Sequence, residues 1–346
     1  MTATQRALLN ALRLALAGVA MGLAAGPFFL SDTQLSVLAD FFSMLVLAIL
    51  WNLLAGYADI VTIGQHAFVG VGAYAFYAFA ALARVDPYLS IPLAGVVALI
   101  IAVPTMALLF RLRTAYFSIG TWVVAEVMML GAGKIEAFGG GSGISVPIEI
   151  LRAFGSTRSG RLATIYWLGF VLAVFALGST YLLLRSRFGV GLMAMRENEE
   201  SAASVGVNVA RARILCFLGV APVLGITGAL ITLQKLRIAP QASFSIVDWS
   251  ILITFIVVIG GIGTIEGPVL GTIFFFVLRE YLSDLGTWHL ILLGTFSIAI
   301  ILIDRRGIWG LVRRFALPAD LIPIAHRSSS ENMAVVKRAR LERPGR

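Results

Sequence analysis

Residues 36–57 read SVLADFFSMLVLAILWNLLAGY, and Asp40 is the one charged residue among them. An α-helix needs about 20 mostly apolar residues to cross the hydrocarbon core of a bilayer, whereas apolar runs of about 10 to 14 residues are typical of helices buried in soluble proteins. The length of this run therefore predicts a membrane-spanning helix.

Similar apolar runs follow along the whole chain, and we expect about ten spans. They are expected at residues 14–30, 36–57, 62–83, 89–110, 115–132, 163–184, 212–233, 249–262, 267–282 and 288–303. The run 249–262 is too short to cross a bilayer by itself, so it either continues into flanking polar residues or forms a partial helix buried in protein. The expected fold class is all-α, in a polytopic integral membrane protein.

The composition of the chain supports this fold class. Of its 346 residues, 59% are hydrophobic and 13% are charged, against about 25% charged in an ordinary soluble domain. This composition excludes a water-soluble globular protein. The single cysteine, Cys216, and the three histidines exclude a disulfide framework and a cysteine-rich or histidine-rich metal site within the chain, so we expect no metal and no cofactor.

The distribution of basic residues predicts the orientation of the spans. Cytoplasmic connections of membrane proteins carry an excess of Lys and Arg, and the chain has 27 of these against 18 Asp and Glu. With the N-terminus inside, most of the basic residues fall on the cytoplasmic side, including those in the tail from Arg305 to Arg346. We therefore expect an N-in and C-in topology.

The N-terminal segment leaves two interpretations open. Arg6 and Arg13 precede an apolar run that ends at Gly26, which is the arrangement of a signal peptide. The run is long for the apolar core of a signal, and the spacing of Gly18, Gly22 and Gly26 suits a retained helix that packs closely on a neighbour.

No catalytic or nucleotide-binding motif is present in the sequence. The patterns G-x-x-x-x-G-K-[ST], H-E-x-x-H and G-x-S-x-G are all absent. We therefore expect that the chain is not an enzyme and does not hydrolyse ATP by itself. The spans also lack a series of carboxylates or histidines that would form a proton relay, which argues against ion-driven transport.

Four polar residues within the expected spans are candidates for a solute path: Gln65, His66, Thr121 and Glu126. An ionisable group at the bilayer centre costs roughly 2.5 to 3.5 kcal/mol on insertion scales, so it points either to a polar path or to pairing with another helix. For His66 and Glu126 a purely structural hydrogen-bonding role is the alternative.

Helix-breaking residues gather in two places within the apolar sequence. Interrupted backbone in a membrane either lines a cavity or packs very closely, because lipid cannot satisfy the freed amide groups. We expect helix breaks at Gly56, Gly64, Gly70 and Gly72 in the first half and at Gly260, Gly261, Gly263, Gly267, Pro268 and Gly271 in the second.

Two hydrophilic connections stand out between the spans. The external one, residues 133–162, is rich in glycine and predicts a flexible connection. The internal one, residues 185–213, mixes acidic and basic residues with small apolar ones, which predicts a short helix along the cytoplasmic face. The basic segment after Leu317 is expected to be disordered and to have affinity for anionic lipid.

Several motifs, in this order, resemble one known family. They are NLLAGYADIVTIGQHAFVGVGAY at 52–74, YFSIGTWVVAE at 116–126, SRFG at 186–189, RENEESAASVGVN at 196–208, GGIGTIEGPVLG at 260–271 and DRRG at 304–307. Over about residues 40–312 the chain resembles the branched-chain amino-acid ABC transporter permeases, and most closely the M-type subunit of the paired permeases.

The resemblance implies the partners and the location. It implies a second permease subunit of the H type, two ATP-binding subunits inside and an extracytoplasmic amino-acid-binding protein, in the bacterial inner membrane. We expect three regions: an N-terminal segment with the first span at 1–35, a permease domain at 36–312 and a basic cytoplasmic tail at 313–346.

The resemblance further implies a loop that docks on the ATPase. The family pattern E-A-A-x-x-x-G maps onto Glu200, Ser201, Ala202 and Gly206, with Ser201 in place of the first alanine. The Ile-x-Leu-Pro continuation of many importers is absent. The expected coupling residues are Arg196, Glu197, Glu200, Ser201, Ala202, Ala203 and Gly206, within the loop 185–213.

The implied function is that of a permease subunit of an ATP-driven importer for branched-chain or related amino acids, with a path that opens alternately to each side. Three alternatives are an ion-gradient-driven transporter or channel, the same type of importer carrying urea or amides, and a membrane scaffold without transport. Nothing in the spans selects the solute.

Overall fold

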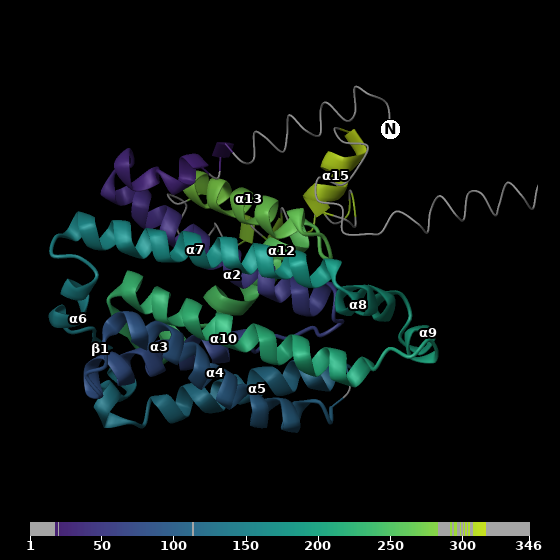
Figure 1. Ribbon diagram of the computed structural model, residues 1–346, viewed down its shortest axis with the longest axis horizontal. Coiled ribbons are helices and arrows are strands. Elements are labelled where there is room, and N and C mark those ends of the chain that lie inside the picture. Colours follow the sequence, from purple (N-terminus) through teal and green to yellow (C-terminus); the bar gives the residue numbers. More distant parts are fainter. Residues whose placement is uncertain are drawn as a thin grey trace, which may run out of the picture.

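The computed structural model describes residues 18–19, 21–112, 114–282 and 307–315, together with residues 291, 292, 294, 295, 298, 300, 302 and 304. These residues form a bundle of helices (Figure 1). The expected spans 14–30 and 288–303 and most of the tail 313–346 lie wholly or partly outside the described residues. The number of ten spans therefore stays a prediction.

Six helices in the described residues are long and apolar enough to cross a membrane. They are α2 (Asp32–Gly56), α4 (Pro87–Leu109), α5 (Thr114–Ala132), α7 (Arg158–Arg185), α10 (Val209–Lys235) and the broken helix Pro240–Gly260. In the most apolar part of α2, 78% of the residues are buried, against 17% in α5. Helix α2 therefore lies at the centre of the bundle, where it contacts α7, α10, α12 and α13, and α5 lies at its edge.

The broken helix explains the short apolar run at 249–262. Helix α11 (Pro240–Ser243) leads into a π-helical turn at Val247–Ile251, and α12 (Leu252–Gly260) continues from it. The span thus extends into flanking polar residues, which is the first of the two alternatives that the sequence allowed.

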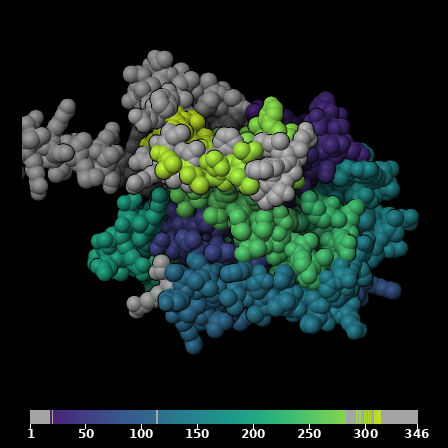
Figure 2. Space-filling model, turned by 180° about the vertical axis from the view of Figure 1, so that it is seen from behind, coloured from purple at the N-terminus to yellow at the C-terminus, as the bar shows by residue number. Residues whose placement is uncertain are grey.

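Two further helices belong to the bundle, and one caps it. Helix α3 (Gln65–Tyr77) continues into a π-helical turn at Ala78–Leu82, and α13 (Glu266–Leu282) follows the glycine-rich connection after α12. Helix α15 (Gly307–Phe315) packs against α12 and α13. Figure 2, from behind, shows the green residues of the α11–α13 region over the middle of that face, between the blue α4–α5 region and yellow-green α15.

Glycines allow α3, α4 and α10 to approach one another closely. A Cβ at Gly72 of α3 would overlap the carbonyl oxygen of Gly225 in α10, and a Cβ at Gly228 would overlap that of Val69. A Cβ at Gly95 of α4 would lie 2.8 Å from the Pro222 oxygen of α10. Small residues let helix backbones come into contact, which is how membrane helices pack without a hydrophobic driving force between them.

The expected helix breaks divide into two groups. Gly56 ends α2, Gly64 precedes α3, and Gly260, Gly261 and Gly263 lie at the end of α12 and in the connection that follows it. The prediction of breaks at Gly70, Gly72 and Gly271 is wrong, because these residues lie inside helices, where they make room for neighbouring side chains or backbone. Gly267 and Pro268 lie in the first turn of α13, where a proline costs no helical hydrogen bond.

The connection at 133–162 is built differently from the expected flexible loop. It contains helical turns at Glu136–Phe138 and Gly140–Ser142, strand β1 (Ile144–Ser145) and helix α6 (Ile148–Ala153). Strand β1 pairs antiparallel with β2 (Arg237–Ile238), so that Ile144 lies opposite Ile238. This pairing anchors the connection to the end of α10 and adds a small sheet to the helical fold.

The connection at 185–213 forms two helices where one was expected. Helix α8 (Arg187–Glu197) follows α7 directly, and α9 (Glu199–Ser204) follows α8 after one residue. Figure 1 shows α8 and α9 at one end of the bundle and β1 and α6 at the other. A remaining short helical turn at Gly26–Phe28 precedes α2.

Candidate functional site

Two helix caps build the α8–α9 segment. The Ser186 hydroxyl accepts a hydrogen bond from the Gly189 amide at 3.3 Å and starts α8. The side-chain oxygen of Asn198 accepts one from the Ser201 amide at 2.8 Å and starts α9. Such side chains satisfy the first amides of a helix, which have no partner within it. Residues of the quoted motifs 186–189 and 196–208 thereby fix two successive helices.

The last turn of α8 contacts the connection between α12 and α13. The Arg196 guanidinium donates from Nη1 to the Gly263 carbonyl oxygen at 3.2 Å. The Gly263 amide donates to the side-chain oxygen of Asn52, in α2, at 2.7 Å, and Asn52 donates from Nδ2 to the Thr264 carbonyl at 2.7 Å. The glycine-rich connection is thus held from two sides, by α2 and by α8.

A second set of bonds joins α9 to the start of α10. The Arg213 guanidinium lies 3.1 Å from Asp59 Oδ2 and 3.0 Å from Glu199 Oε2. The Arg213 side chain is 21% exposed, but Asp59 and Glu199 are 63% and 53% exposed. Because solvent screens exposed ion pairs, these contribute little stability and mainly fix the position of α9. A hollow of about 750 Å³ lies beside them and reaches Val61, Phe110 and Phe117.

The expected coupling residues lie together in α8, α9 and the turn after α9. Ala202 is buried, and the other six are exposed: Arg196, Glu197, Glu200, Ser201, Ala203 and Gly206. Gly206 has a φ of +95°, and no atom lies within 4 Å of the place where its Cβ would be. Position 206 therefore favours glycine because of its backbone conformation, and not because a side chain would lack space. Val205, next to it, is an apolar side chain that is 78% exposed.

Two of the expected path residues are held between helices. His66 is fully buried, and its Nδ1 lies 3.0 Å from the Ile63 carbonyl oxygen and 2.9 Å from Ser250 Oγ. Gln65 donates to the Trp249 carbonyl oxygen at 2.7 Å. Each side chain keeps one buried polar atom, Gln65 Oε1 and His66 Nε2, with no hydrogen-bond partner among the described residues.

Thr121 fixes the junction between α3 and α5. Its hydroxyl accepts hydrogen bonds from the amides of Ile63 at 3.3 Å and Gly64 at 3.1 Å, and donates to the Ser118 carbonyl at 2.7 Å. A Cβ at Gly64 would overlap the Thr121 carbonyl. The Thr121 hydroxyl therefore fixes the backbone of Ile63 and Gly64, directly before α3.

Glu126 is half-buried in α5, and its carboxylate lies within electrostatic range of the His66 side chain. Its carboxylate accepts a hydrogen bond from Trp122 Nε1 at 3.0 Å, one turn earlier in α5. Five residues along an α-helix rotate by about 140°, so Thr121 and Glu126 face different ways. Trp122, Val123 and Val127 beside it are exposed. The structure therefore gathers Gln65, His66 and Thr121 at the start of α3, with Glu126 within electrostatic range of His66.

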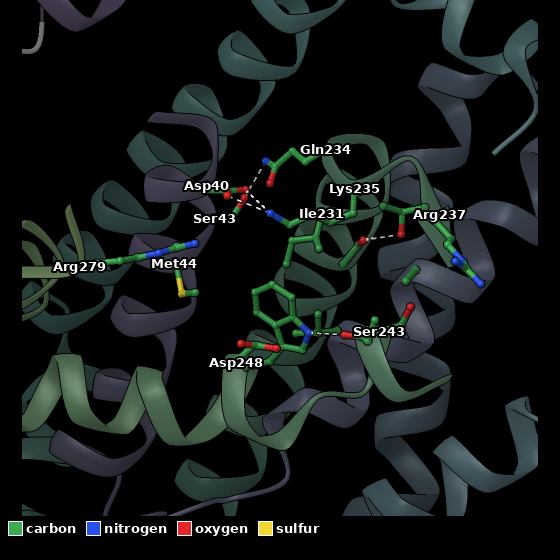
Figure 3. Close-up of a pocket in the computed structure, with 16 residues that line it drawn as sticks. Asp40, Ser43, Met44, Ile231, Gln234, Lys235, Arg237, Ser243, Asp248 and Arg279 are labelled. Atoms are coloured by element: carbon green, nitrogen blue, oxygen red, sulfur yellow. Dashed lines mark hydrogen bonds and ion pairs between the residues drawn. The ribbon is translucent and has the colours of Figure 1, made fainter. Parts of the chain in front are cut away.

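A cavity of about 230 Å³ lies near the β1–α6 end of the bundle, between α2, α3, α10, α13 and the α11–α12 segment (Figure 3). Asp40 and Lys235 form an ion pair there at 2.9 Å. The cavity combines charged and apolar side chains, namely Asp40, Lys235, Arg237, Asp248 and Arg279 with Met44, Val69, Ile231 and Trp249. None of them was a candidate on the sequence alone.

Residues 33–303 match the family described as branched-chain amino acid transport system / permease component. The chain belongs to this family. The high-affinity branched-chain amino acid transport system permease protein LivM of Salmonella typhimurium is 26% identical over 84% of this chain and 73% of its own length. LivM of Escherichia coli is 24% identical, with the same coverage. The probable permease protein LivH of Methanocaldococcus jannaschii is 26% identical over 60% of this chain and 66% of its own length. No solved structure matches the chain significantly.

Family membership confirms the family that the motifs indicated. Together with the six apolar helices found among the described residues, it makes the chain a helical multi-pass membrane protein and a transport permease component. The relatives are named as permease proteins and not as enzymes.

Sequence analysis missed four residues that position the candidates: Asn52, Asp59, Glu199 and Arg213. Asn52, Asp59 and Glu199 lie within the quoted motifs, so a polar residue in a family motif was the available signal. Their partners could not be read from the chain, since Asp59 and Arg213 are 154 positions apart.

Proposed function

We propose that this chain is the transmembrane permease subunit of an ATP-driven ABC importer for branched-chain or related amino acids. The family supports the transport role, and the Arg196–Gly263 hydrogen bond carries the proposal of coupling. It joins an exposed segment, α8–α9, to the connection between two helices of the bundle. A partner that moves α8 would move this connection with it, because packed elements shift as units.

The proposed assembly contains a second, H-type permease, two ATP-binding subunits and an extracytoplasmic amino-acid-binding protein. Similarity to both LivM and LivH relatives supports the pairing of related permeases. The basic residues support N-in and C-in topology with about ten spans in the bacterial inner membrane. In this orientation the α8–α9 end is cytoplasmic and the β1–α6 end is external. The permease domain 36–312 lies between the segment 1–35 and the tail 313–346.

The ATP-binding subunits would dock on the exposed face of α8–α9. Glu197, Glu200, Ser201 and Ala203 offer polar and small side chains there, and the adjacent hollow of about 750 Å³ gives a docking partner room. ATP hydrolysis belongs to these partners, and the permease itself does no covalent chemistry.

Glu126 remains the proposed path residue, and its position suggests where the second permease lies. A carboxylate facing lipid near the bilayer centre costs roughly 2.5 to 3.5 kcal/mol, yet the half-buried Glu126 borders the exposed face of α5, with Trp122 as its hydrogen-bond partner. We place the second permease against this face. Gln65, His66 and Thr121 would act on the path indirectly, by holding the junctions of α3 with α5 and with the Val247–Ile251 turn.

The test is uptake of labelled leucine into proteoliposomes that contain the whole assembly, with ATP inside. The native chain is compared with a Glu200→Arg, Gly206→Arg double variant, and assembly is checked by co-purification. We expect the variant to assemble but to lose uptake together with stimulated ATP hydrolysis. Uptake that needs no ATP would overturn the proposal in favour of a gradient-driven carrier, and competition by urea or acetamide would redirect the solute assignment.

A further inference from the structure

The cavity near the external end has a lining that divides into two kinds of surface. Met44, Val69, Ile231 and Trp249 form an apolar wall, and charged groups of both signs lie around it. Figure 3 shows Arg279 extending into the cavity from the side opposite Lys235 and Arg237, with Asp248 on the lower side. A pocket with a mostly apolar wall and a few placed polar groups is the usual form of a small-molecule site.

The charges in the cavity are not all neutralised by one another. Lys235 is paired with Asp40, and Arg237 donates to the Ser142 carbonyl oxygen. Asp248 accepts a hydrogen bond from Ser245 Oγ at 2.6 Å, and Arg279 lies over the Phe276 ring at 5.9 Å. Within the described part of the chain, neither Asp248 nor Arg279 has an ion-pair partner. Arg237 also has no ion-pair partner among the described residues, but the Ser142 carbonyl engages its guanidinium. This leaves the Asp248 carboxylate and the Arg279 guanidinium available in the same cavity.

The side-chain oxygen of Gln234, also in the lining, lacks a hydrogen-bond donor among the described residues. Gln234 is held by its amide nitrogen, which donates to the Ala39 carbonyl at 3.2 Å and to Ser43 Oγ at 2.9 Å. Its Oε1 is buried and has no hydrogen-bond partner among the described residues. A buried acceptor without a donor costs free energy, so a ligand that supplies an N–H group would be favoured here.

We propose that this cavity binds a zwitterionic amino acid with a short apolar side chain on the external side of the permease. The α-carboxylate pairs with Arg279, the α-ammonium group pairs with Asp248 and donates to Gln234 Oε1, and the side chain lies against Met44, Ile231 and Trp249. Charge-assisted hydrogen bonds of this kind are the strong ones. This site rests on the proposed function and specifies its solute class.

The size and the charge pattern of the cavity favour an amino acid over urea or a simple amide. About 230 Å³ corresponds to the volume of roughly eight water molecules, which suits a small solute. A neutral amide carries no separated charges, so it would leave both Asp248 and Arg279 unpaired. An amino acid neutralises both groups at once.

The test is equilibrium binding of labelled leucine to the permease pair with its ATP-binding subunits, in nanodiscs and without the external binding protein. Asp248→Asn and Arg279→Gln are compared with the native chain. Arg152→Gln is the matched control, since it removes a charge from α6 outside the cavity. Because each cavity variant loses a charged hydrogen bond, we expect it to bind leucine at least about tenfold more weakly than the native chain. We expect the control to bind leucine with native affinity.

Competitors that lack one charge separate the two roles. 3-Methylbutylamine has no carboxylate, and 4-methylpentanoate has no ammonium group. Relative to leucine, the amine should compete better in Arg279→Gln and the acid should compete better in Asp248→Asn. Native leucine affinity in both variants would overturn the site, and so would equal competition by urea.

Uptake measured on the same preparations distinguishes this site from the proposed function. If native assembly imports leucine but the cavity variants bind and import it normally, the site is wrong and the function stands. If the native assembly binds leucine in the cavity but imports none with ATP, the site stands and the importer assignment is wrong.

Discussion

The guanidinium of Arg196 occupies the space that a side chain at Gly263 would need. A Cβ at Gly263 would overlap the Arg196 guanidinium, and the φ of Gly263 is +72°, a conformation that side-chain-bearing residues rarely adopt. The two residues are 67 positions apart and belong to different motifs. Gly263 therefore allows the left-handed backbone turn after α12 and also leaves space for the Arg196 side chain of α8.

Replacing Arg196 should weaken the coupling between ATP hydrolysis and uptake. In Arg196→Gln the bond to the Gly263 carbonyl is lost, so motion of α8 would no longer be passed to the α12–α13 connection. We expect ATP-dependent leucine uptake to fall about tenfold while the assembly still hydrolyses ATP. Uptake and phosphate release are measured on the same proteoliposomes. Arg187→Gln is the control, because it removes an exposed arginine from the other end of α8.

A second variant tests the same contact from the glycine side. Gly263→Ala displaces the guanidinium and adds left-handed backbone strain of about 1–2 kcal/mol, so it should uncouple in the same way. If Arg196→Gln and Gly263→Ala both import at the native rate per ATP hydrolysed, the contact has no part in coupling.

The sequence predicted the parts of the fold that depend on local pattern. Apolar length located α2, α4, α5, α7 and α10, since a bilayer imposes that length on any spanning helix. It did not reveal the π-helical turn at Val247–Ile251 or the β1–β2 pairing, because both depend on contacts between distant segments.

The candidate site was predictable to a similar extent. Motif resemblance located α8–α9, but the partner of Arg196 is 67 positions away and that of Glu199 is in the next helix, and neither could be read from spacing. Glycine is ambiguous for a related reason. Gly56 ends a helix and contacts Gly263, whereas Gly72 lies inside a helix and allows contact with Gly225 of α10. The two roles can be told apart only when the contacting residue is known.

The contact between α3 and α10 should not tolerate a single methyl group. Gly228→Ala places a Cβ against the Val69 carbonyl oxygen, which belongs to helix backbone and cannot move aside. We expect a loss of about 1–3 kcal/mol in stability. Gly219→Ala in the same helix meets nothing within 4 Å and should be neutral or stabilising by up to about 1 kcal/mol. Thermal unfolding of the purified assembly checks both, and equal midpoints would contradict the close packing.

At position 59, the stability of the protein should depend more on the backbone conformation that the residue adopts than on its charge. Its φ is +55°, which Asn tolerates and Ala does not, and its ion pair with Arg213 is largely exposed. Asp59→Asn should therefore cost under about 1 kcal/mol, whereas Asp59→Ala should cost about 1 kcal/mol more. Unfolding midpoints at low and high salt separate the two contributions. If Asp59→Asn and Asp59→Ala lower the unfolding midpoint equally, and high salt abolishes the difference from the native chain, the charge of Asp59 and not its backbone conformation determines the loss of stability.

The exposed face of α5 should be covered by the second permease in the assembly. The one native cysteine, Cys216, is 2% exposed, so an introduced cysteine can be labelled selectively. A nitroxide spin label attached to a cysteine at Val127 of α5, which is 63% exposed here, should be shielded from lipid-dissolved oxygen when the pair is assembled and accessible to it when this chain is alone. A spin label at Val171 of α7, which is 59% exposed, should be accessible to oxygen in both states, because lipid covers that face. Shielding at Val171 with free access at Val127 would move the interface to α7, and Glu126 would then need another explanation.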